Sequence, residues 1–160
     1  MSMDCLVGFG LLCGHMIGDY IFQNDYMAGN KTNTWPGPDP YSHPRDWQDA
    51  NGLVQAQLEW LVKEKAYRTG YISCTIHCFL YTFAVWMCAF WWMPLWGLIA
   101  CFLIHWPIDR FRLAYWWMNN VSGQKFFASK EHPMFPNSII LVDNTFHLVT
   151  LFVIALLYFV

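Results

Sequence analysis

Long apolar runs, broken by a few polar residues at regular spacing, dominate the hydrophobic pattern of this 160-residue chain. Four runs approach the roughly 20 residues that an α-helix needs to cross the hydrocarbon core of a bilayer. They cover residues 5–23, 71–92, 95–113 and 138–160. The pattern predicts an all-α membrane protein, a four-transmembrane-helix bundle that forms one integral membrane domain over residues 1–160.

The long connection between the first two runs, residues 32–70, divides into two parts. Its first part, "TNTWPGPDPYSHPRDWQDAN", is rich in Pro, Asp and Asn and predicts irregular surface chain. Its second part, "GLVQAQLEWLVKEKAYR", places Val54, Leu58 and Leu61 at helical spacing but is too polar to span a bilayer. We expect an interfacial amphipathic helix lying on the cytoplasmic leaflet; a helix packed against the end of the bundle is the alternative.

The composition agrees with a membrane protein. Only 12% of the residues are charged and 56% are apolar, whereas soluble domains are about 25% charged. The net charge of −2 says nothing about nucleic acid, but the sequence has no basic patch with interleaved aromatics, so we expect membrane lipid, and no nucleic acid, as a partner. The six cysteines lie within apolar runs; Cys74 and Cys78 flank His77 as candidate soft metal ligands, but packing is the favoured interpretation.

The basic residues predict the orientation. All nine Lys and Arg fall between the first and second runs, or from the end of the third run to the start of the fourth. Such connections face the cytoplasm according to the positive-inside rule. We therefore expect a multi-pass protein of the cell inner membrane with both termini outside the cytoplasm.

A polar stripe interrupts the first run, where His15, Asp19 and Gln23 follow one another at intervals of four. This spacing places the three side chains on one face of a helix. Similar residues interrupt the other runs: His77 in the second, His105 and Asp109 in the third, and Asp143 and His147 in the fourth. Since the predicted helices alternate in direction, each Asp lies about 6 Å nearer the cytoplasm than its His. We predict that the four histidines converge in one cluster.

Three carboxylates inside a membrane need compensating positive charge. No Lys or Arg is expected at their depth, although Arg110 and Arg112 could reach them from the membrane surface. Imidazole and carboxylate together suit a divalent transition metal such as Zn, Mn or Fe. The predicted ligands exceed one tetrahedral site and could hold two ions: His15, Asp19, His77, His105, Asp109, Asp143 and His147. Structural hydrogen bonds between helices, or a proton relay, are the alternatives.

The order HxxxDxxxQ, a single His, HxxxD followed by Arg110, and a final DxxxH resembles the small bacterial and phage membrane proteins of domain of unknown function 3307. A more distant likeness is to the membrane-bound metal-dependent hydrolases. The first resemblance implies that Lys31 and Asn144 join the polar set, with Asn144 where family members have Gln. It also implies that residues 32–70 are an insertion. The family lends no established activity.

Three functions are compatible with the pattern. The first is a metal-dependent hydrolase of a lipid-like substrate, with Asp19 or Asp143 as ligand or general base. Gln23 and Arg110 would then steady an anionic headgroup, together with Lys31 and Asn144 if the resemblance holds. The second is metal-ion or proton transport, although the outer halves of the runs are almost wholly apolar. The third is an interaction protein, such as a phage modulator of a host membrane complex, with a structural His/Asp cluster. A homo-oligomer is compatible with each.

Overall fold

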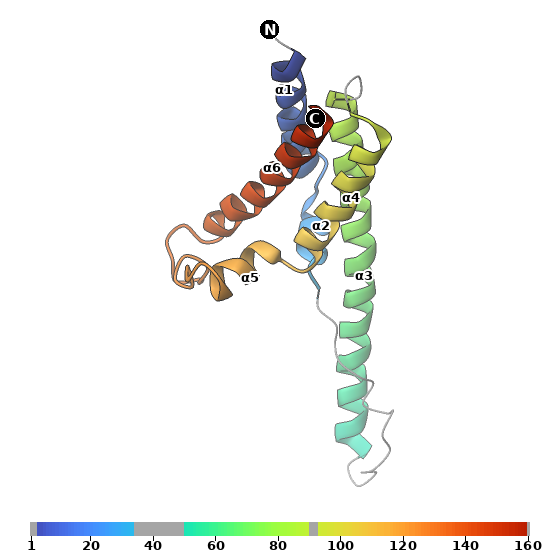
Figure 1. The fold of residues 1–160 in the computed structure, drawn as a ribbon. Helices are drawn as coiled ribbons and strands as arrows, with labels where there is room; N and C mark the ends of the chain where they lie inside the picture. The colour runs from blue at the N-terminus through green and yellow to red at the C-terminus, as the bar shows by residue number, and fades with distance from the viewer. Residues whose placement is uncertain (1–2, 34–49, 90–92, 160) are drawn as a thin grey trace.

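The computed structural model describes residues 3–33, 50–89 and 93–159, and the regular secondary structure of these residues is all helical, without strands. The elements are α1 (Met3–Met16), the π-helical η1 (Ile17–Ile21), α2 (Asp25–Asn30), α3 (Ala50–Ala89), α4 (Leu95–Arg110), α5 (Leu113–Asn120) and α6 (Asn137–Phe159). Four of them form a ring in which α1 and α4 each contact both α3 and α6 (Figure 1). The predicted all-α class is confirmed.

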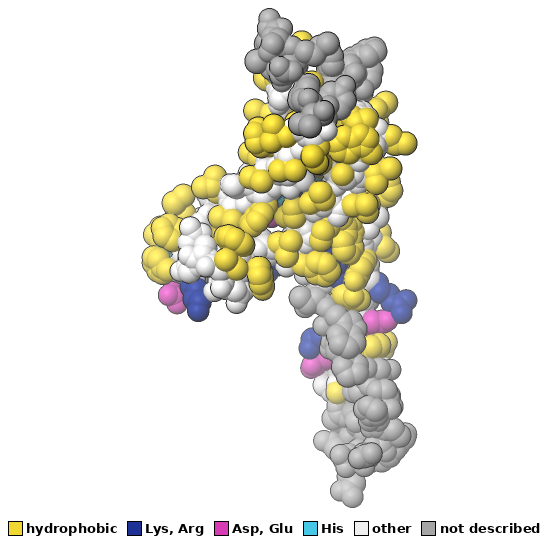
Figure 2. Space-filling view, viewed as in Figure 1, with side chains coloured by type: hydrophobic (Ala, Val, Ile, Leu, Met, Phe, Trp, Pro, Cys, Tyr) yellow, Lys and Arg dark blue, Asp and Glu magenta, His cyan; other side chains and the backbone are white. Residues whose placement is uncertain are grey.

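Two of the helices are long and apolar enough to cross a membrane. They comprise Gln55–Ala89 within α3 and Asn137–Leu157 within α6, while Leu6–Ile21 is a shorter apolar stretch. Only 17% of the most apolar window of α6 is buried inside the protein. Hydrophobic side chains cover the body of the molecule in Figure 2, and most of the visible charged side chains lie at its lower ends. Two candidate membrane-spanning helices are thus established, from the second and fourth predicted runs.

The predicted interfacial helix over residues 52–68 is not a separate element. It forms the first half of α3, a 40-residue helix that runs directly into the second apolar run. Gly70 lies at the junction, but one glycine costs a helix only about 1 kcal/mol and does not end it. The first half of α3 therefore projects beyond the other helices instead of lying across them (Figure 1). The predicted irregular segment lies mostly outside the described residues.

The third apolar run ends earlier than predicted, at Arg110 instead of Leu113. Arg112 adopts a left-handed conformation with φ of 52°, which a non-glycine residue rarely adopts and which breaks the helix. The chain then starts α5, which lies crosswise to the bundle (Figure 1). This break turns a predicted connection into a short helix beside the start of α6, with which α5 makes contact (Figure 1).

Close backbone packing joins α1 and η1 to α3. Gly10, Gly14 and Gly18 recur every four residues on the side facing α3. A Cβ atom at Gly14 would lie 2.5 Å from the Cα atom of Val85, and one at Gly18 would lie 2.9 Å from the Cα atom of Tyr81. Small residues at such spacing let membrane helices approach closely. This approach carries the polar residues of α1 and η1 to those of α3.

Candidate metal centre

The four histidines of the apolar runs lie together in the middle of the helix ring. His15, His77, His105 and His147 are each at most 1% exposed. The ring centroids of His105 and His147 are 4.0 Å apart, those of His77 and His105 are 5.2 Å apart, and those of His15 and His147 are 5.9 Å apart. The predicted convergence of the four histidines is confirmed.

Asp19, His77 and His105 bring three potential ligand atoms into one small triangle. The Nε2 atoms of His77 and His105 are 3.1 Å apart. Oδ1 of Asp19 lies 3.3 Å from Nε2 of His77 and 3.8 Å from Nε2 of His105. An ion placed at equal distance from these three atoms, in their plane, would lie about 2 Å from each of them. This value is close to the Zn–N and Zn–O distances of about 2.0–2.2 Å. The triangle therefore fits a transition-metal ion.

Asp109 offers one oxygen to this triangle and the other to a second donor group. Its Oδ2 atom lies 3.0 Å from Nε2 of His77 and 3.2 Å from Nε2 of His105. Its Oδ1 atom lies 3.5 Å from Nε2 of His147, which is also 3.4 Å from Oδ2 of Asp143. Asp109, Asp143 and His147 form a second group with metal-ligand spacing. One carboxylate could therefore bridge two ions, as in two-metal sites.

Two of these ligand atoms are buried without a hydrogen bond. Oδ1 of Asp19 and Nε2 of His147 have ion-pair neighbours at 3.3 to 3.8 Å but no hydrogen-bond partner in the described part of the chain. Buried polar atoms are nearly always satisfied, and each exception needs a physical explanation such as an ion. One such atom belongs to each donor group, so both groups fit a metal ion in the chemistry of their ligands as well as in their spacing.

His15 lies beside the donor groups and orients one of their members. Its Nδ1 atom is 3.3 Å from Oδ2 of Asp19 and 3.2 Å from the hydroxyl oxygen of Tyr81. The donor groups found among the described residues do not include His15. Tyr81 was not predicted, although it follows His77 by four residues and so shares its helix face. Its buried ring stacks on His105 at 3.8 Å.

Lys31 supplies a positive charge that was not expected at the carboxylates. Its Nζ atom donates to Oδ2 of Asp109 at 2.9 Å and to Oε1 of Gln23 at 2.8 Å. Burial disfavours the charged form, but the Asp109 carboxylate outweighs it and raises the pKa of the Lys31 ammonium. The expectation of no cation at this depth is wrong because α2, capped by Asn24, turns the chain back toward the bundle.

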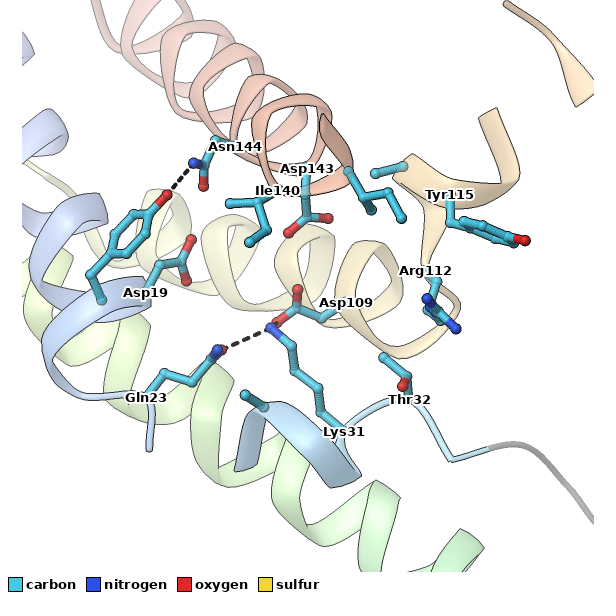
Figure 3. A pocket seen from close by; sticks show the side chains of 14 residues that line it. Asp19, Gln23, Lys31, Thr32, Asp109, Arg112, Tyr115, Ile140, Asp143 and Asn144 are labelled. Atoms are coloured by element: carbon cyan, nitrogen blue, oxygen red, sulfur yellow. Dashed lines mark hydrogen bonds and ion pairs between the residues drawn. The ribbon is translucent and has the colours of Figure 1, made fainter. Parts of the chain in front are cut away.

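A cavity of about 370 Å³ opens onto the carboxylates. Asp19, Asp109 and Asp143 point into it from three elements (Figure 3). Its remaining lining mixes cationic, amide, hydroxyl and apolar side chains: Tyr20, Gln23, Ala28, Lys31, Thr32, Arg112, Ala114, Tyr115, Ile139, Ile140 and Asn144. The cavity could thus admit a molecule that carries both an anionic group and an apolar part.

The predicted substrate-binding residues divide into two groups. Gln23, Lys31 and Asn144 line the cavity, and the amide of Asn144 donates to the hydroxyl of Tyr20 (Figure 3). Arg110 instead packs over the ring of Tyr71, at 4.4 Å, and donates to the backbone carbonyl of Lys31 at 3.2 Å. Arg112, and not Arg110, lines the cavity. The left-handed backbone at Arg112 directs its side chain there.

No family model matches this chain, and no curated protein or solved structure matches it. The resemblance to domain of unknown function 3307 stays a prediction. The fold and the site define an all-helical protein with two candidate membrane-spanning helices and buried His/Asp groups that could hold a metal ion. The geometry of the site alone carries the functional argument.

Proposed function

We propose that this chain is a multi-pass inner-membrane protein that holds one or two divalent transition-metal ions. The observation that carries the proposal is the packing of ligand atoms at metal-ligand spacing, with one buried orphan atom in each group. Asp19, His77, His105 and Asp109 would hold the first ion. Asp109, Asp143 and His147 would hold the second, and His15 would orient Asp19.

Four membrane spans are proposed because each of the four packed helices exposes large apolar side chains. Phe9 on α1, Phe79 on α3, Leu103 on α4 and Phe152 on α6 are 62% to 64% exposed. Exposed apolar surface on every helix suits lipid better than water. The start of α1 and the end of α6 lie at the same end of the molecule (Figure 1), which supports an even number of spans. Both termini would face away from the cytoplasm.

The segment after α4 would take the interfacial position that the sequence suggested for residues 52–68. Trp116 and Phe126 are more than half exposed, and Lys125 and Lys130 accompany them. Aromatic and basic side chains together are typical of the membrane–water interface. Because α5 also lines the cavity, the cavity would open at the level of lipid headgroups.

Hydrolysis of an anionic, lipid-like substrate is the activity that we propose for this cavity. Lys31 and Arg112 would attract the anionic group, and Ile139 and Ile140 would contact the apolar part. A divalent ion at these ligands supplies Lewis acidity toward a phosphoryl or acyl oxygen. Asp143 lines the cavity and its side chain is 27% exposed, so its free oxygen could accept a proton from the attacking water.

Elemental analysis of the full chain purified in detergent tests the metal centre. We expect about one or two transition-metal ions per chain, and a lower melting temperature after chelation because a ligand at 100 times its Kd stabilises by about 2.7 kcal/mol. His132→Gln, outside the cluster, is the control and should keep the metal. A protein without stoichiometric metal whose melting temperature ignores chelator would refute the proposal.

A second function is favoured by one specific contact, the ion pair between Lys31 and Asp109. This pair already compensates one buried carboxylate without any metal. The His/Asp cluster would then be a structural polar core of a membrane interaction protein. The same measurement separates the two functions, because such a core would keep its full stability in chelator.

A further inference from the structure

Cys78 forms a further donor group with two residues of the metal centre, His105 and Asp109. It follows His77 on α3 and is completely buried. Its Sγ atom, one ring nitrogen of His105 and one carboxylate oxygen of Asp109 all lie within 4.8 Å of one another. The packing role suggested by the apolar run does not account for this placement beside two ligands.

The separations between these three atoms are only slightly longer than those between two ligand atoms of one metal ion. Sulfur and nitrogen atoms bound to one tetrahedral zinc ion lie about 3.5 Å apart, given bond lengths of about 2.3 and 2.0 Å. Closing a separation of at most 4.8 Å to that value requires a shift of up to about 1.3 Å. His105 already shares a triangle with Asp19 and His77, and Oδ1 of Asp19 is an orphaned buried atom of that triangle.

The charges of the buried groups favour one further anion. Asp19 and Asp109 carry two negative charges, and the Lys31 ammonium offsets one of them. A divalent ion would leave this group with one excess positive charge, which is costly in a buried site. A Cys78 thiolate would make the group neutral, since a thiol that coordinates a metal loses its proton.

We infer that Cys78 is a thiolate ligand of the ion held by Asp19, His77, His105 and Asp109, and that the site takes thiophilic Zn²⁺ in preference to Mn²⁺. This inference rests on the proposed metal centre. On binding, the S–H bond breaks, the sulfur–metal bond forms, and the proton leaves through the cavity to water. Thiolate ligands select Zn over Mn because Mn prefers oxygen ligands.

Cobalt substitution tests the inference by a readout that does not depend on activity. The full chain, stripped of metal in detergent, is titrated with Co²⁺ and its absorption spectrum is recorded. We expect visible d–d bands of bound Co²⁺ together with a near-ultraviolet thiolate-to-cobalt charge-transfer band. Cys78→Ser should lose the charge-transfer band and keep the d–d bands. Cys74→Ser, one turn away and equally buried, should keep both.

The outcomes distinguish this inference from the metal centre itself. Bound Co²⁺ without a charge-transfer band in the wild type would overturn the role of Cys78 and leave the metal centre intact. A band that survives Cys78→Ser and disappears in Cys74→Ser would also overturn it. A wild type that binds no Co²⁺ would refute the metal centre and the inference together. Where Cys78→Ser does not fold, a wild-type spectrum without the charge-transfer band still overturns the inference, and loss of the band in Cys74→Ser does so too.

Discussion

Removal of either partner of the Lys31–Asp109 pair leaves the other buried without its opposite charge. The side chains are 14% and 1% exposed, and their charged atoms are 2.9 Å apart. Losing one partner of a buried ion pair costs about 3–5 kcal/mol. We expect losses of this size in Lys31→Met and in Asp109→Asn. The double variant leaves neither charge, so its loss should be smaller than the sum by about 1–3 kcal/mol.

The assay is the free energy of unfolding of the four proteins in detergent, with chelator present throughout so that metal binding does not contribute. The exposed pair of Glu64 and Arg68, with atoms 2.6 Å apart, is the control. Its cycle should give a coupling of about 0.5 kcal/mol or less, as expected for such pairs on a helix surface. Losses at Lys31 and Asp109 that add within about 0.5 kcal/mol would refute the role of Lys31 as the counterion.

Three further predictions concern packing, metal content and topology. Gly14→Ala should destabilise the protein by about 1–3 kcal/mol through overpacking against α3, whereas Gly8→Ala, where a Cβ meets open space, should be neutral or stabilising in thermal unfolding. In a protein that holds two ions, His147→Gln should remove one of them, as measured by elemental analysis. His15→Gln should keep both ions with weaker affinity. Equal metal contents in the two variants would contradict the assignment. A reporter fused to the C-terminus should signal from outside the cytoplasm and one in the connection between α5 and α6 from inside, and the reverse result would overturn the topology.

The convergence of the histidines could be predicted because it depends only on local periodicity and on helix direction. Polar residues four apart share a face, and helices of alternating direction bring those faces to one level. The ion pair of Lys31 could not be predicted, since it requires α2 to fold back after η1. This return depends on tertiary packing that no periodic pattern records.

The two errors in the helix boundaries have a similar origin. Residues 52–68 show an amphipathic pattern that is equally compatible with a separate helix and with the start of a longer one. Gly70 could end a helix or continue it, and its close contact with the backbone of Asn30 accompanies continuation. Arg112 gives no local signal for its left-handed conformation, because residues with this conformation are usually Gly, Asn or Asp.

The unbroken length of α3 has a mechanical consequence. Forty helical residues span about 60 Å, twice the thickness of a hydrocarbon core. His77 lies about 40 Å along this rod from its first residue, and no described break separates it from the projecting half. A force that tilts or rotates the projecting half of α3 would therefore also move His77. Asp19 lies in η1, which packs closely against the backbone of α3 at Gly18, so the same rotation would change the separation of His77 and Asp19.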